Sequence, residues 1–161
     1  MTAFPTLIKE DVERFDVLLE DLLEQSGANT ALIVEKAGYL IHECGDRAPY
    51  NNTEIASLAA ASFGAAEFVA ERLEETNFTS ISLQGERMNT LILKMTDNAL
   101  LVIIFPANIS MTVMRNFAKH IARQIANQIY SAMQRDPANL IDLADLNPTS
   151  ASDVFKTKPP Q

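Results

Sequence analysis

The sequence has few of the residues from which enzymes and metal sites are built. It contains one cysteine and two histidines, Cys44, His42 and His120, and their spacing matches no metal-ligand motif. None of its five glycines belongs to a glycine-rich phosphate-binding loop. The lone cysteine cannot form an internal disulfide, which suits a reducing compartment. The sequence therefore predicts no catalytic residues, no metal site and no cofactor.

Basic residues and long apolar runs are also scarce. The chain has 13 lysines and arginines and 21 aspartates and glutamates, and the resulting net charge of -8 would repel nucleic acid and anionic lipid. No apolar run approaches the roughly 20 residues that span a bilayer, and the N-terminus lacks a signal-peptide pattern. We therefore expect a cytoplasmic protein with no nucleic acid partner and no membrane insertion.

A hydrophobic fraction of 47% is typical of a folded domain, and we place that domain at residues 1–136. Residues 137–161 are rich in Pro, Ser, Thr and Asp, which predicts a flexible C-terminal tail. The tail holds two short apolar clusters, one between Leu140 and Leu146 and one at Val154 and Phe155. The second cluster is either a short anchor for a partner or an inert terminus, and we favour the inert terminus.

Hydrophobic periodicity and turn signals predict eight elements in the order α-β-β-α-β-β-β-α. Three helices are expected at residues 10–25, 51–75 and 110–134, with Gly27 ending the first and Asn51 capping the second. Five strands are expected at residues 30–36, 39–44, 78–84, 87–95 and 99–105. The predicted class is α+β, a five-stranded and mainly antiparallel sheet with one long helix on one face and two helices on the other.

The first and third helices carry opposite charges. The first holds seven acids and one arginine between Glu10 and Gln25, while the third presents Arg115, Lys119 and Arg123 at intervals of four. This contrast predicts that the two helices are neighbours on one sheet face. Two solvated faces of opposite charge are an equally good explanation.

The second helix has no charged residue between Glu54 and Glu67. A helical projection places an inward stripe at Ile55, Leu58, Ser62, Ala66, Val69 and Leu73. The opposite side is small and apolar, with Ser57, Ala60, Ala61, Gly64 and Phe68. We interpret that side as a partner-binding surface. The alternative is a strip rich in alanine because alanine favours helices.

The strand at residues 78–84 has no charged residue. Thr79, Ile81 and Leu83 are expected to face the core, and the strand has no proline or lysine that would prevent pairing with another chain. At a sheet edge it would favour pairing with another copy, although a central strand would give the same pattern.

Four segments in order resemble the Roadblock (dynein light chain) family, above all its bacterial branch that partners a Ras-like gliding-motility GTPase. They are residues 31–41, 55–60, 84–88 and 100–105, within a resemblance that runs from about Val12 to Met133. Two positions depart from the branch: residues 106–111 replace an acidic residue and a Thr-Ser-Leu-Gly stretch, and Glu67-Phe68 stands where small residues are common. The second departure predicts a bulkier and more acidic surface.

The resemblance implies a homodimer whose third strands pair into one sheet and whose second helices form a platform for a Ras-like GTPase. Some members accelerate GTP hydrolysis by reshaping the GTPase's own loops, with no inserted arginine finger. The partner-binding residues would be Ser57, Ala60, Ala61, Gly64 and Phe68. The dimer interface would be Ala61, Ala65, Phe78, Thr79, Ser80, Ile81, Ser82 and Leu83.

The expected function is therefore that of a regulatory protein-binding domain and not that of an enzyme. One alternative is a Roadblock scaffold that assembles with itself or with another Roadblock chain and contacts no GTPase. Another is a small-ligand sensor or enzyme that uses a cleft between sheet and helices, and the lack of converging polar residues disfavours it.

Overall fold

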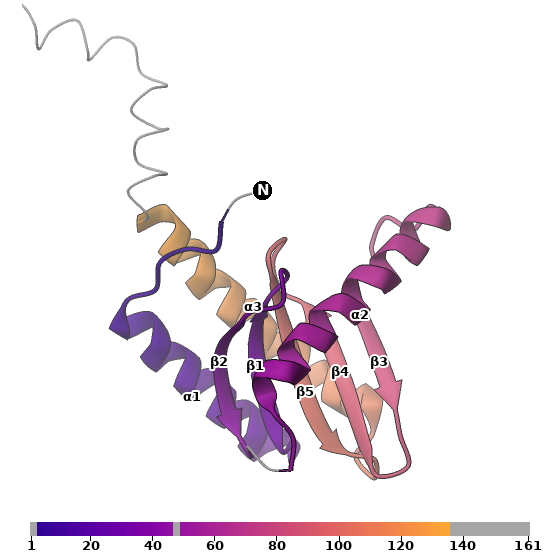
Figure 1. Ribbon diagram of the computed structural model, residues 1–161. Helices are drawn as coiled ribbons and strands as arrows, with labels where there is room; N and C mark the ends of the chain where they lie inside the picture. Colours follow the sequence, from indigo (N-terminus) through magenta and orange to yellow (C-terminus); the bar gives the residue numbers. More distant parts are fainter. Residues whose placement is uncertain (1–2, 47–48, 136–161) are drawn as a thin grey trace, which may run out of the picture.

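The predicted order of elements is confirmed in the computed structural model, which describes residues 3–46 and 49–135 (Figure 1). The elements are α1 (Lys9–Ser26), β1 (Thr30–Glu35), β2 (Leu40–Gly45), α2 (Asn52–Arg72), β3 (Ser80–Gln84), β4 (Met88–Lys94), β5 (Ala99–Pro106) and α3 (Met111–Arg135). The largest difference is that α2 ends at Arg72 and not near residue 75. The tail predicted at residues 137–161 lies outside the described residues.

Both predicted helix boundary signals act as expected. Gly27 adopts a left-handed backbone conformation with φ of 76° and ends α1, and its N–H donates to the carbonyl of Leu23. The side chain of Asn51 accepts hydrogen bonds from the N–H groups of Thr53 and Glu54 at the start of α2. Local side-chain chemistry therefore sets where these two helices begin and end.

The sheet is antiparallel throughout, in the order β2-β1-β5-β4-β3. β1 pairs with both β2 and β5, so the first hairpin is joined to the later meander through β5. β3 pairs only with β4 in this order and forms one edge of the sheet. The edge alternative for the strand at residues 78–84 is therefore confirmed.

Helices cover both faces of the sheet: α2 lies on one face, and α1 and α3 lie together on the other (Figure 1). Each face of the sheet has its own hydrophobic core, and β5 contributes to both. Leu101, Ile103 and Phe105 point to α1 and α3, whereas Leu100 and Val102 point to α2. This double burial explains why β5 is a continuous apolar run without polar alternation.

The expected adjacency of α1 and α3 is confirmed, but the predicted basic row does not hold them together. Arg135 near the end of α3 pairs with Asp11 in the first turn of α1. Arg14 donates to the side chain of Gln124 at 3.1 Å. Arg115, by contrast, reaches toward β3 and donates to the hydroxyl of Ser82 at 2.9 Å. The helix pair is therefore joined at a few specific polar contacts.

Asp11 is the fully buried centre of this connection. Burial alone would raise the pKa of its carboxyl, but hydrogen bonds from Arg135, the N–H of Ile8 and Gln128 outweigh burial and lower the pKa below its ordinary 3.8. One carboxylate thus caps α1 and ties it to α3.

Asp11→Asn should lower the free energy of unfolding by about 2 kcal/mol near neutral pH, because hydrogen bonds to a buried charge are lost. A lowered folded-state pKa makes the carboxylate's contribution complete above 3.8, and the contribution disappears as the pH falls through the folded-state pKa. Urea unfolding should therefore show a smaller difference between variant and wild type at about pH 3 than at about pH 7. A difference that stays constant with pH would contradict this role.

Candidate protein interface

The rotation of α2 differs from the one predicted. The side chains that α2 packs against the sheet are Ala56, Ala59, Ala60 and Phe63, and Ala70 further along the helix is buried too. Three residues expected to face inward are exposed instead: Leu58 is 57%, Val69 60% and Leu73 74% exposed. Ser62 is exposed too, and Ile55 and Ala66 are half-buried. The predicted inward stripe of α2 is therefore wrong at Leu58, Ser62, Val69 and Leu73, whereas Ile55 does pack against the core.

Phe63 explains the observed rotation. Its ring is fully buried and lies 5.1 Å, between centroids, from the ring of Phe78 just before β3. Alanines on either side of Phe63 let the helix approach the sheet closely, and the one aromatic ring fills the space between them. A helix that is apolar all round lacks the polar contrast that would orient it, so the fit of side chains decides which face turns inward.

The outer face of α2 is consequently more apolar than predicted. Phe68, 66% exposed, lies there together with the exposed Leu58, Val69 and Leu73, and we call these four residues the α2 stripe. Of the predicted partner-binding residues, Ser57, Ala61 and Phe68 are exposed and Gly64 is partly so. Ala60 is only 5% exposed and packs on the sheet, so its placement on the outer surface is wrong.

Gly64 is not required by packing inside the protomer. A Cβ built on it would meet no heavy atom within 4 Å. Glycine in a helix interior costs about 1 kcal/mol relative to alanine, and here nothing in the described chain offsets that cost. The open space beside Gly64 would allow another molecule to approach the helix closely.

Ser57 also makes a contact inside the protomer. Its hydroxyl donates to the carbonyl of Gly38 at 3.1 Å and so joins α2 to the turn between β1 and β2. Although exposed, the hydroxyl is already partnered within the protomer. The hydrogen bond therefore helps to hold the start of the helix in place.

The β3 edge continues the apolar surface of α2. Leu83 is half-exposed, whereas Ile81 and Phe78 pack against the core beneath α2. Thr79 is exposed, so the prediction that Thr79 and Leu83 face the core is wrong. Ala61 and Ala65 lie exposed on α2. The uncharged strand leaves one side of its backbone without a strand partner in the described sheet.

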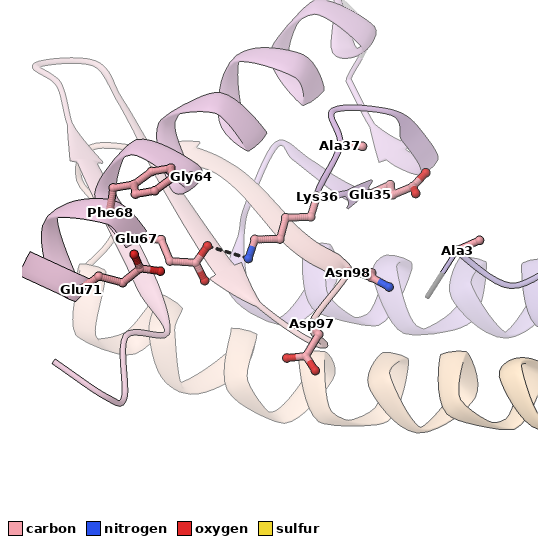
Figure 2. A pocket seen from close by; sticks show the side chains of 10 residues that line it. All are labelled: Ala3, Glu35, Lys36, Ala37, Gly64, Glu67, Phe68, Glu71, Asp97 and Asn98. Atoms are coloured by element: carbon pink, nitrogen blue, oxygen red, sulfur yellow. Dashed lines mark ion pairs between the residues drawn. The ribbon is translucent and has the colours of Figure 1, made fainter. Parts of the chain in front are cut away.

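An open groove of about 960 Å³ borders the α2 stripe (Figure 2). Gly64, Glu67, Phe68 and Glu71 line its helical side, and the turns between β1 and β2 and between β4 and β5 close its other sides. Lys36 crosses toward the helix and pairs with Glu67 at 2.6 Å, and Lys94 lies 3.9 Å from the same carboxylate. The acidity expected from Glu67 is thus largely balanced by two lysines.

The two histidines and the cysteine lie in separate surroundings. The Nε2 atom of His42 lies 2.6 Å from Oδ1 of Asp16, and the Nε2 atom of His120 lies 3.0 Å from Nε2 of Gln124. Burial and the carboxylates of Glu20 and Asp16 raise the pKa of the Cys44 thiol, which lowers its reactive thiolate fraction. Residues 3–46 and 49–135 bring together no group of three or more metal-ligating side chains. Within the same residues, no helix is both long and apolar enough to cross a membrane.

The chain is similar to known proteins of one domain family. Residues 14–105 match the model of the Roadblock/LC7 domain. Among solved structures, the chain is similar to an MglB with a tetrameric arrangement, with a TM-score of 0.75 and 25% identity, over 82% of this chain and 99% of that one.

Two further solved structures share the fold. The gliding protein MglB from Thermus thermophilus aligns with a TM-score of 0.74 and 24% identity over 81% of this chain and 99% of that one. MglB from Myxococcus xanthus aligns with a TM-score of 0.69 and 22% identity over 73% of this chain and 96% of that one. No curated protein sequence matches the chain.

Phe63→Ala should lower the free energy of unfolding by about 3–5 kcal/mol, because it removes a fully buried ring and leaves a cavity. Leu73→Ala, at an exposed position, should change it by less than about 0.5 kcal/mol. Thermal or urea unfolding of the two variants distinguishes the observed rotation of α2 from the one predicted from sequence. The reverse ranking would restore the predicted rotation.

Proposed function

The chain belongs to the Roadblock/LC7 domain family, and on that premise we propose that it is a regulatory domain that forms a homodimer and binds a small Ras-like GTPase through α2. The observation that carries the proposal is the α2 stripe, an exposed apolar surface on a helix that also packs on the sheet. Patches of this kind are typical of protein interfaces. A cytoplasmic role in motility or cell polarity, the setting suggested by the MglB likeness, is part of the proposal.

Dimerisation is supported by the edge position of β3. Two copies of β3 related by a two-fold axis would continue the sheet and satisfy the outer backbone groups of both strands. The same axis would bring two α2 helices side by side, where the small exposed Ala61 and Ala65 permit close contact. The proposed dimer interface consists of Ala61, Ala65, Phe78, Thr79, Ser80, Ile81, Ser82 and Leu83.

The GTPase would contact the platform made by the paired helices. Phe68 supplies an exposed aromatic side chain, a residue type enriched at the centre of protein interfaces. Gly64 beside it leaves open space for close approach. The Roadblock domain would contribute no catalytic group, and any stimulation of GTP hydrolysis would come from rearranged loops of the GTPase itself.

A scaffold that assembles only with itself or with another Roadblock chain is the alternative. The tetrameric arrangement of one similar MglB structure favours assembly between copies beyond a dimer. The two functions differ in one observable, since only the first requires a GTPase to bind the α2 platform.

Leu83→Lys should convert the dimer into a monomer, because it places a charge at the proposed seam between the two β3 edges. Sedimentation velocity on the full chain measures the change directly. Val17→Lys is the matched control, since Val17 is an exposed aliphatic residue on α1, away from β3, and its variant should remain a dimer. A Leu83→Lys variant that stays dimeric would remove β3 from the interface.

Gly64→Arg should weaken binding of the GTP-loaded Ras-like GTPase from the same organism by at least about tenfold, or 1.4 kcal/mol. Gly64→Ala is the control for folding: its methyl group enters open space, so the protein should be about 0.5–1 kcal/mol more stable. Isothermal titration calorimetry on both variants, with the dimer verified, provides the test. Equal affinity of Gly64→Arg and wild type would exclude the platform, and no binding by wild type would favour the scaffold.

A further inference from the structure

A second groove lies on the sheet face opposite α2, between α3 and strands β3 and β4. Its volume is about 440 Å³, and its apolar lining includes Leu93, Met95 and Tyr130. Its cationic lining comes from Lys119 and Arg123 of α3, and none of the described residues that line it is an acid. The groove is therefore both partly apolar and positively charged.

Neither Lys119 nor Arg123 forms an ion pair within the described part of the chain. Lys94 also borders the groove, but its ammonium lies near Glu67 and Asp97, toward the α2 side of the sheet. Arg115, one turn before Lys119, extends the cationic row to Ser82 on the β3 edge. In a protein with a net charge of -8, such a row favours an occupant that is acidic and apolar.

We propose that residues 140–146 of the same chain dock in this groove. Their sequence, Leu-Ile-Asp-Leu-Ala-Asp-Leu, combines aliphatic side chains with Asp142 and Asp145 and contains no basic residue. The groove offers the complement, an apolar floor with unpaired cations beside it. The other apolar cluster beyond α3, Val154 and Phe155, is followed by Lys156 and Lys158 and has the wrong charge for this site.

The chain is long enough to reach the groove. Along α3, Tyr130 lies about 7.5 Å before Arg135, and Arg123 lies about 18 Å before it. The ten residues from Arg135 to Asp145 span up to about 33 Å when extended, and Pro137 directly after α3 disfavours continuation of the helix. Residues 140–146 can therefore return antiparallel to α3 and bring Asp145 beside Arg123.

Docking on this face leaves the α2 platform free, so the proposal does not depend on binding of a GTPase. It replaces the expectation of a flexible tail for residues 140–146 with that of a bound segment. The proposed docking involves no residue beyond 146.

Hydrogen exchange on the full chain, followed by mass spectrometry, tests the docking. In Lys119→Glu/Arg123→Glu, the amides of residues 140–146 should exchange at least about fivefold faster than in wild type. Adding Asp142→Lys/Asp145→Lys to that variant should restore slow exchange, because the charges are then complementary again. Lys9→Glu/Arg87→Glu carries the same change in net charge at other exposed positions and should exchange like wild type.

Exchange in wild type as fast as in Lys119→Glu/Arg123→Glu would overturn the proposal. So would slow exchange that the four-residue charge swap fails to restore, since the complementary charges would then not determine docking. Unchanged protection of α3 amides in every variant shows that the helix remains folded.

Discussion

The contact between Phe63 and the sheet determines how the rest of the molecule can be used. With its ring buried against Phe78 and its alanine neighbours close to the strands, α2 has a single face that fits the sheet. Its larger aliphatic residues must then point outward, although they are more hydrophobic than the alanines that replace them in the core. Contact with another surface would remove these side chains from water, and this is the physical basis of the proposed role in protein binding.

The two sheet faces consequently have different roles. On one face, α1 and α3 bury their apolar stripes against the strands and are joined through Asp11 and Arg135. On the other face, a single helix leaves an apolar surface next to an unguarded edge strand. The chain belongs to the Roadblock/LC7 domain family, and the proposed function assigns the uncovered face to protein contacts.

Most of the fold was predictable because its signals are local or strictly periodic. Gly27, Asn51 and the alternation of turns and apolar runs predicted all eight elements in order. The rotation of α2 was not predictable by the same means, since Leu58, Val69 and Leu73 outweigh alanines in any hydropathy projection. Phe63 with Ala56, Ala59 and Ala60 forms an alternative helical stripe, and its aromatic residue was the overlooked signal. The pairing of Glu67 with Lys36 and its proximity to Lys94 were not predictable in the same way, because the two lysines are distant in sequence, one after β1 and one in β4.

The central claim is that the α2 stripe is covered in the working protein, and hydroxyl-radical footprinting of the full chain in solution measures this most directly. The account predicts that, with the Ras-like GTPase bound, Phe68 and Leu73 are oxidised much more slowly than their exposure in a single protomer implies, whereas Val17 on α1 is oxidised at the rate expected for its own exposure. Oxidation of Phe68 and Leu73 at the full rate of exposed residues, both alone and with the Ras-like GTPase present, would contradict it.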